Sequence, residues 1–372
     1  MPGSIFDRDR LIIKSLDERK NQIIFRDKMV TLAFRPDNLP DETLRIIKET
    51  ASRIIKARKD NKPVILAFGA HTIKNGLSPV LTELIRRGWV THLATNGAGI
   101  IHDWEFAFQG ESGENVRENT AKGQFGIWQE TGLFLNLAIT VGAFENLGYG
   151  ESVGKMISRE GLDIPDMQFL ADQAVKNIKA DPGYAASAAD LLETIKKRRI
   201  KPGFMSIPHP FKEFSVQCAA YELEVPFTGH PMIGHDIIYT HPANNGAAIG
   251  RTALRDFLCY AGSVAGIDGG VYLSIGSAVM SPMIFEKSLS MAQNVHIQNG
   301  KHIDGHMIVV VDLARNEWDW NRLGEPPADN PAYYLRYCKT FSRMGGEMHY
   351  LQADNRDFLC ELFHVLSETG PD

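Results

Sequence analysis

A short, uninterrupted apolar run in the first quarter of the chain most constrains the fold. Residues 63–68 (PVILAF) include no polar side chain and end at Gly69. A run of this length without polar alternation is typical of a parallel strand buried on both faces. A helical pattern over residues 78–87 follows, and residues 90–95 form a second strand pattern. This order predicts a strand, a crossover helix and a parallel strand, which is the repeating unit of open α/β sheets.

The remainder of the chain continues this alternation. Further strand-like runs lie at residues 225–228, 270–275, 307–313 and 348–351, between helical patterns at residues 41–55, 252–264 and 356–366. We therefore predict an α/β fold with a doubly wound, mainly parallel sheet flanked by helices, of the Rossmann-like kind. The sequence has no internal repeat and no low-complexity linker. We expect an N-terminal arm of residues 1–40 and a single domain of residues 41–372.

Composition and charge exclude several classes of protein. Lys and Arg number 40 against 45 Asp and Glu, and the basic residues are dispersed, so nucleic-acid binding is not expected. No run approaches the roughly 18 apolar residues of a membrane span, and residues 132–147 are expected to form a buried core helix. Charges at residues 7–10 argue against a signal peptide. The four cysteines lie far apart without a CxxC pair, which indicates a reduced, cytoplasmic protein.

A glycine-containing turn follows the second predicted strand. Asn96-Gly97-Ala98-Gly99 begins like the dinucleotide fingerprint G-x-G-x-x-G, although the last glycine is absent. Glycines at this place let backbone N–H groups approach a pyrophosphate at a helix N-terminus. The same residues also suit a tight turn between a strand and a helix, and a second glycine-rich stretch at residues 266–277 has the same two interpretations.

Four polar side chains are concentrated within a dozen residues. His230, His235, Asp236 and His241 match no standard spacing of metal ligands, and no cysteine is nearby. We predict no metal site here. The segment is interpreted instead as a hydrogen-bonded loop or as part of a substrate site.

Taken together, these segments resemble the deoxyhypusine synthase family, NAD-dependent enzymes that transfer an aminobutyl group from spermidine to a protein lysine. The resemblance extends over most of residues 64–366 and is clearest in residues 69–77 and 90–99. It implies the same fold and an NAD site formed by His71, Lys74, Asn75, Asn96, Gly97, Ala98, Gly99, Asp354 and Asn355. It also implies that Asp236, in the segment GHDIIY, lies near the substrate.

The resemblance also implies a nucleophile. Residues 331–339 have the proline-to-lysine spacing of the family's catalytic segment, with an aromatic residue two positions before the lysine. Lys339 is therefore the best candidate for taking over an imine from an oxidised polyamine, which requires a neutral amine. Tyr333 and Tyr337 are candidate substrate contacts. The alternative is that Lys339 is an ordinary surface lysine.

This chain departs from the family at three places. Ile101 and His102 stand where the family has adjacent glutamates, and Tyr333 stands where it has another glutamate. These carboxylates would orient a diamine, so spermidine itself is not implied. Ser281 lies in the stretch that carries the family's histidine, and hydride departure needs another proton acceptor. The candidates are His102, which is also a candidate substrate contact, His235 and His241.

We therefore predict an NAD-dependent aminoalkyl transferase of the deoxyhypusine synthase type that acts on a polyamine or a similar amine. The acceptor is either a protein lysine or a second amine, as in homospermidine formation. By analogy with the family, a homotetramer is expected. A different hypothesis is a non-catalytic nucleotide-binding protein that has kept the sheet and lost the transfer chemistry.

Overall fold

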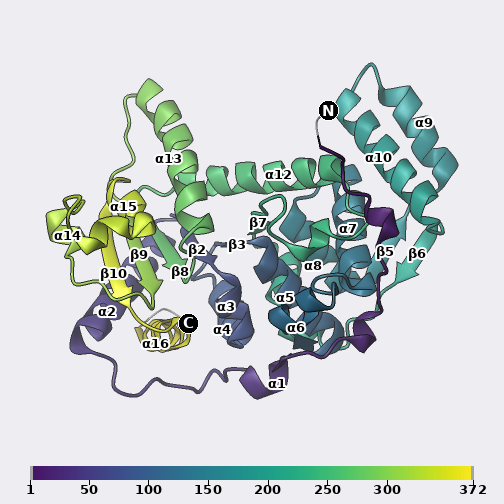
Figure 1. Ribbon diagram of the computed structural model, residues 1–372. Helices are drawn as coiled ribbons and strands as arrows, with labels where there is room; N and C mark the ends of the chain where they lie inside the picture. Colours follow the sequence, from purple (N-terminus) through teal and green to yellow (C-terminus); the bar gives the residue numbers. More distant parts are fainter. Residues whose placement is uncertain (1–2, 370–372) are drawn as a thin grey trace. The chain divides into compact units, whose positions relative to one another are not determined.

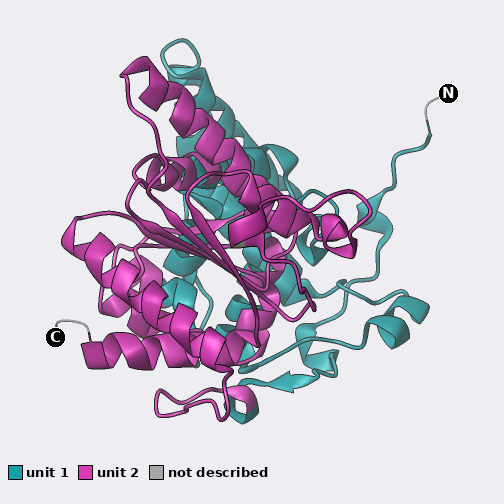
Figure 2. Ribbon diagram, turned by 90° about the vertical axis from the view of Figure 1, so that its left-hand side faces the viewer, with its two compact units in different colours: residues 1–27, 100–218, 231–256 teal, residues 28–99, 219–230, 257–372 magenta. Residues whose placement is uncertain are grey.

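The computed structural model describes residues 3–369 and divides into two compact units (Figures 1 and 2). Unit 1 consists of residues 1–27, 100–218 and 231–256, and unit 2 of residues 28–99, 219–230 and 257–372. These boundaries differ from the predicted arm of residues 1–40 and single domain of residues 41–372, and that division stays a prediction.

Unit 2 is built on a six-stranded parallel sheet with the strand order β10-β9-β8-β2-β3-β7. The strands are β2 (Val64–Phe68), β3 (His92–Thr95), β7 (Phe227–Gly229), β8 (Val271–Ile275), β9 (Met307–Asp312) and β10 (Glu347–Gln352). Numbered along the chain, the order reads 3-2-1-4-5-6 from β7 to β10. This is the order of a doubly wound Rossmann-like sheet, and it confirms the predicted fold class.

Helices cover both faces of this sheet (Figure 2). On one face, α16 (Asn355–Thr369) packs against α2 (Asp41–Lys59) and α4 (Ser78–Arg86). On the other face, α13 (Met280–Gln298) packs against α15 (Arg336–Ser342). Because side chains alternate between the two faces of a strand, each apolar strand contributes side chains to the core layers on both faces of the sheet. The second layer is a buried cluster that includes Ile65, Tyr272, Phe285, Val310 and Phe341.

Local sequence signals account for the ends of several helices. Pro79 occupies the first turn of α4, where its missing N–H costs no hydrogen bond. The helix α10 (Pro182–Arg198) begins at Asp181, whose side chain accepts a hydrogen bond from the Tyr184 N–H. Gly88 follows α4 with φ +68°, a left-handed conformation that glycine adopts without strain.

Unit 1 is mainly helical. Its helices include α6 (Val116–Ala121), α7 (Gln129–Phe144), α8 (Tyr149–Arg159), α9 (Met167–Asn177), α10 and α11 (Val216–Glu222, which continues into unit 2). Two antiparallel ribbons join β1 (Ile23–Ile24) to β4 (Glu111–Ser112) and β5 (Gly161–Ile164) to β6 (Gly203–Ser206). The helices α5 (Gly97–Gln109) and α12 (Gly246–Ala265) each contain a boundary between the units.

The apolar helix α7 lies in the core of unit 1. Eleven of its sixteen residues are buried, among them Leu135 and Val141, which confirms the expected buried core helix. Asn136 is buried with them and donates to the carbonyl oxygens of Gly132 and Ile238. Within residues 3–369, no helix has the length and apolar content needed to cross a membrane.

Candidate functional site

The carboxyl ends of the strands of unit 2 meet at one edge of the sheet because all six strands are parallel. Between β2 and β8 the chain order reverses, since β3 and β7 lie on one side and β9 and β10 on the other. Ligands of open α/β sheets bind outside the carboxyl ends of the strands at such a switch point. The residues that directly follow these two strands are Gly69 and Gly276.

Two glycines bring the backbones together at this switch point. A Cβ atom on Gly69 would collide with the carbonyl oxygen of Gly276. Gly276 itself has φ +55°, and a Cβ atom there would lie 2.5 Å from Nδ2 of Asn355. Both positions therefore require glycine, because the two backbones lie in contact where the strands end.

Asn355 links this loop to the helix after β2. Its side chain is buried and its Nδ2 donates to Oγ1 of Thr72, 3.2 Å away. Thr72 lies in α3 (Ala70–Lys74), which also carries His71 and Lys74, and Asn75 follows directly. The structure thus brings the predicted cofactor segments of residues 71–75 and 354–355 into contact. Sequence analysis missed Thr72, which lies between two predicted residues.

The side chains on α3 differ in exposure. His71 is exposed, whereas Lys74 and Asn75 are half-buried. Partial burial lowers the pKa of His71, and the Lys74 charge lowers it further. A neutral imidazole and one ammonium group are consequently available beside the switch point at neutral pH.

The predicted turn after β3 has a clear local role. The Asn96 side chain accepts a hydrogen bond from the Gly99 N–H at 2.9 Å and so caps the start of α5. A Cβ atom on Gly99 would collide with Oγ1 of Thr95. Gly97 is buried and Ala98 is half-buried. Helix capping and close packing therefore account for this sequence, and a dinucleotide contact here stays a prediction.

Asp354 accepts hydrogen bonds at the start of α16. Its Oδ1 accepts a hydrogen bond from the Arg356 N–H at 2.8 Å, and its carbonyl oxygen accepts one from the Phe358 N–H. The side chain is half-buried. Asp354 thus fixes the helix that places Asn355 against Gly276.

The predicted nucleophile lies at the β10 edge of the sheet. Lys339 is on α15, and its ammonium nitrogen is 3.5 Å from the centroid of the Tyr333 ring, so an aromatic face attracts the charged form of this side chain. The buried Tyr337 lies on the same short helix, and its ring packs on that of Tyr350. Neighbouring strands are about 4.8 Å apart, so β10, three strands away from β2, lies about 14 Å from it.

The histidines proposed as proton acceptors belong to unit 1 and have different surroundings. His102 Nδ1 is 2.6 Å from Oγ of Ser112, which in turn donates to Glu105. Glu105 forms a fully buried ion pair with Arg19. His102 therefore adjoins a buried charged network. His235 is exposed.

His241 is buried and neutral at physiological pH. Burial lowers its pKa to about 4, with smaller contributions from the Arg198 and Arg8 charges. Its Nδ1 accepts a hydrogen bond from the Ala243 N–H at 3.1 Å. The proton of the neutral ring is therefore on Nε2, and the acceptor nitrogen is already engaged.

Asp236 is the most perturbed carboxyl group of the predicted site. Burial raises its pKa to about 7. Its neighbours Tyr149, at the start of α8, and Tyr239, in the 3-10 helix Ile237–Tyr239, both have pKa values raised by burial first and by the Asp236 charge second. Among residues 3–369, Oδ2 of Asp236 and the hydroxyl groups of both tyrosines are buried without a hydrogen-bond partner.

This cluster of Asp236, Tyr149 and Tyr239 is named here the acidic cluster. Buried polar atoms without partners are costly and uncommon, and they indicate places where a ligand or water binds. Asp256 adds a second carboxylate, which accepts a hydrogen bond from the Gly150 N–H and also raises the pKa of Tyr149. Asp236 was a candidate from its place in the segment GHDIIY, whereas neither tyrosine was predicted as a site residue.

The remaining candidate residues form hydrogen bonds or lie beside ion pairs within the fold. His230 is buried and its Nε2 lies 2.9 Å from Oγ1 of Thr228. Ser281 belongs to a buried chain of hydroxyl groups with Tyr272 and Ser274. In the described part of the chain, potential metal ligands gather at Glu49, Glu347 and His349, but Arg45 already pairs with Glu49. We assign no metal to this group.

Comparisons with known proteins show similarity of fold only. No protein-family model and no curated protein sequence matches the chain. Among solved structures, AgrE in complex with ornithine and NAD+ aligns with 89% of this chain at 16% identity and a TM-score of 0.45. A LOR/SDH protein from Methanococcus maripaludis aligns with 96% of this chain and 76% of its own length, at 13% identity and a TM-score of 0.42.

A third structure is assigned by its description to the family that the sequence resembles. A protein described as a deoxyhypusine synthase from Entamoeba histolytica aligns over 87% of this chain and 88% of its own, at 11% identity and a TM-score of 0.32. This chain spans about a third of the length of AgrE, 34%. At these identities the comparisons assign no substrate and no reaction.

Proposed function

We propose that this protein is an NAD-dependent enzyme that oxidises an amine and transfers the resulting aminoalkyl group. The observation that carries the proposal is the switch point between β2 and β8, where the sheet has the 3-2-1-4-5-6 order and the two strand ends are glycines in contact. Dinucleotides bind at this place in Rossmann-like sheets. Thr72 and Asn355, joined by a hydrogen bond beside the glycines, add polar groups.

The residues at the switch point fit a dinucleotide in part. Lys74 supplies a positive charge beside the strand ends. The N–H groups of Gly69 and Gly276 already donate to the carbonyl oxygens of Ile275 and Val311, so a pyrophosphate would take its hydrogen bonds from other donors. The end of β3 carries Asn96 instead of the acidic residue that usually binds the ribose hydroxyls of NAD. Binding of NADP+ should therefore be measured beside binding of NAD+ in each experiment. When bound, such a cofactor accepts hydride from the carbon beside an amine.

The acidic cluster is proposed to bind the amine. A carboxylate with two tyrosine hydroxyls offers acceptors to an ammonium group, and the buried atoms of the cluster that lack partners would be satisfied by it. Asp236 is also suited to accept the proton that leaves the amine, because a pKa of about 7 lies at the working pH of a general base. His241 suits this role less well, since its acceptor nitrogen is engaged.

Lys339 is proposed to receive the aminoalkyl group as an imine, which would release the other half of the polyamine as a free amine. An acceptor amine would then displace Lys339, and the hydride held by the reduced cofactor would reduce the acceptor imine to the transferred aminoalkyl group. The Tyr333 ring under its ammonium would orient the side chain until the proton is removed. The acceptor is a protein lysine or a second amine, as in homospermidine formation, and the assembly is proposed to be a homotetramer by analogy with the family.

A non-catalytic nucleotide-binding protein is the second candidate. It is favoured by the contact of the Lys339 side chain with the Tyr333 ring, which gives this lysine a packing role, and by the structural role of the Asn96 turn. Borohydride treatment in the presence of NAD+ and a polyamine separates the two candidates, because only the enzyme would leave a mass adduct on Lys339.

Calorimetric titration with NAD+ and NADP+ tests the cofactor site. Gly276→Ala adds a Cβ atom 2.5 Å from the Asn355 side chain at the strand end, and we expect it to weaken dinucleotide binding at least tenfold. Gly88→Ala is the matched control, because Gly88 has a similar φ of +68° and nothing within 4 Å of its Cβ position. Gly88→Ala should lose about 1 kcal/mol of stability from its left-handed backbone alone, and Gly276→Ala should lose more because of its contact with Asn355. Absence of binding to the wild type, or equal affinities in both variants, would contradict the proposed site.

A further inference from the structure

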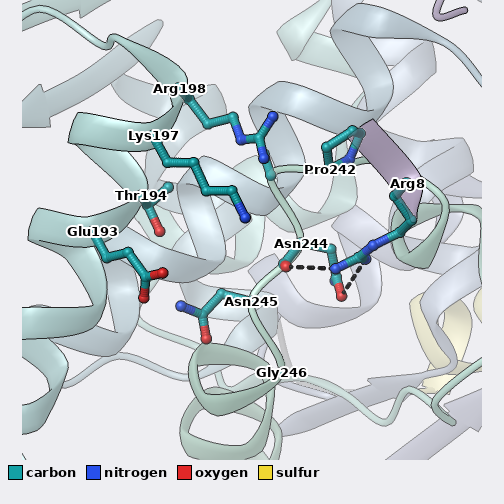
Figure 3. Close-up of a pocket in the computed structure, with 10 residues that line it drawn as sticks. Arg8, Glu193, Thr194, Lys197, Arg198, Pro242, Asn244, Asn245 and Gly246 are labelled. Atoms are coloured by element: carbon teal, nitrogen blue, oxygen red, sulfur yellow. Dashed lines mark hydrogen bonds between the residues drawn. The ribbon is translucent and has the colours of Figure 1, made fainter. Parts of the chain in front are cut away.

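A hollow in unit 1 is lined by three segments of the chain, two of which bring positive charges (Figure 3). Its volume is about 250 Å³, and its charged lining consists of Arg8, Glu193, Lys197 and Arg198. Lys197 and Arg198 extend from the last turn of α10, while Arg8 reaches the loop of Asn244 from the other side. All lining residues belong to unit 1, so the hollow is distinct from the switch point of unit 2.

Arg8 brings a positive charge to the hollow, and its hydrogen bonds go to uncharged groups. Its guanidinium donates to the carbonyl oxygen of Tyr239 at 2.8 Å and to the side-chain and backbone oxygens of Asn244 at 3.1 and 3.2 Å. These partners are neutral dipoles. They fix the position of the guanidinium and leave its positive charge available to a ligand.

Arg198 has an unused donor. Its Nη1 pairs with the Asp9 carboxylate at 2.7 Å, and the side chain is 18% exposed. Its Nη2 is buried and has no hydrogen-bond partner within residues 3–369. A guanidinium held on one side by a carboxylate can donate its second edge to another anion. An unsatisfied buried N–H group of this kind calls for such an acceptor.

The start of α12 adds a favourable potential. Asn245 accepts hydrogen bonds from the N–H groups of Ala247 and Ala248, and Gly246 forms part of the lining. The positive end of a 20-residue helix therefore faces the hollow. Basic residues in the last turn of α10 are common for helix-dipole reasons alone, but this does not account for Arg8, the buried Nη2 atom or the hollow itself.

We propose that this hollow binds a small anion through a carboxylate or phosphate group. The Arg198 Nη2 atom, the fixed Arg8 charge and the Lys197 ammonium, which also lies 3.8 Å from the Asp9 carboxylate, would hold the group. Glu193 on the same wall opposes a second negative charge, so the preferred ligand carries a hydroxyl or ammonium donor beside its anionic group. A volume of 250 Å³ is below that of drug-sized sites and suits a small metabolite.

Calorimetric titration of the full chain with inorganic phosphate and, separately, with glycolate, a carboxylate with an adjacent hydroxyl, tests this site at constant ionic strength. We expect saturable binding in the millimolar range by at least one probe, about tenfold weaker binding to Lys197→Gln and tighter binding to Glu193→Gln. Lys196→Gln removes an exposed charge one residue away on the same helix and should bind as the wild type does. Preference for phosphate or for glycolate identifies the anionic group.

Three outcomes would overturn the proposal. One is the absence of saturable binding by both probes. Another is equal weakening by Lys196→Gln and Lys197→Gln, since that indicates a general charge effect without a site. The last is unchanged or weaker binding to Glu193→Gln, because removing a negative charge from the wall of an anion site must favour the anion. Thermal melts of the variants verify that each one is folded.

Discussion

Replacing Asp236 by Asn should make the protein more stable, and the gain should grow with pH. Burial raises the pKa of this carboxyl group to about 7 in the folded protein, against an ordinary value of 3.8. The folded state therefore keeps the proton up to about pH 7, while the unfolded chain releases it near pH 4. Between these values the folded state binds more protons, so this group lowers stability as the pH rises through that window.

The magnitude follows from the two pKa values. Their difference is about three units, and each unit corresponds to about 1.4 kcal/mol. At pH 8 the ionised Asp236 thus costs up to about 4 kcal/mol relative to a permanently neutral group, and at pH 5 the cost is between 1 and 2 kcal/mol, roughly. Asn is neutral at both pH values and close in shape, so the stabilisation by Asp236→Asn should be about 2 to 3 kcal/mol larger at pH 8 than at pH 5.

Urea unfolding of wild type and variant at pH 5 and pH 8 measures this difference. Asp37→Asn, at an exposed carboxylate, is the control and should change stability by a similar, small amount at both pH values. The contributions of all other titrating groups cancel between wild type and variant. If the gain from Asp236→Asn is the same at pH 5 and pH 8, Asp236 is ionised in the folded protein like an ordinary surface aspartate, and its proposed role as a general base loses its support.

Two further predictions concern a buried ion pair and the nucleophile. Arg19→Ala leaves Glu105 as a buried charge without its cation and should lower the free energy of unfolding by about 3 to 5 kcal/mol. Arg45→Ala, at an exposed ion pair, is the control and should lower it by at most about 1 kcal/mol. Similar losses for the two variants in urea unfolding would show that the Arg19 pair is hydrated. Lys339→Ala should abolish borohydride trapping and group transfer but leave NAD+ affinity and slow NADH formation largely intact, because hydride departure precedes the transfer. Lys301→Ala serves as the control, and transfer at the wild-type rate by a folded Lys339→Ala variant would refute the mechanism.

The sheet was predictable because its strands leave a strong local signal. The run over residues 63–68 became β2, residues 64–68, with every side chain buried, and the remaining five strands were found within two residues of their ends. The two ribbons of unit 1 were not predicted. The β1–β4 ribbon has only two residues in each strand, which is too short for an alternating pattern to emerge from the sequence.

The candidate site was less predictable because its geometry depends on distant segments. Gly276 lies in a stretch that was also interpretable as a turn, and only its contact with Gly69, about 200 residues earlier, explains both glycines. Tyr149 and Tyr239 join Asp236 through packing in unit 1 and carry no motif. The predicted dinucleotide contact at Gly97-Ala98-Gly99 stays a prediction, and the close approach of Thr95 explains why position 99 is glycine.

The position of β2 in the sheet bears on how the chain is synthesised. Its neighbour β3 follows within 30 residues, but Val64 pairs on its other side with Val271, about 200 residues later. While the ribosome produces the helical segments in between, one edge of a wholly apolar strand has unpaired N–H and C=O groups. Such an edge can pair with the wrong segment or with another chain. The nascent protein therefore depends on protection of β2 until residues 271–275 have emerged, and shortening that interval should raise the yield of folded chain.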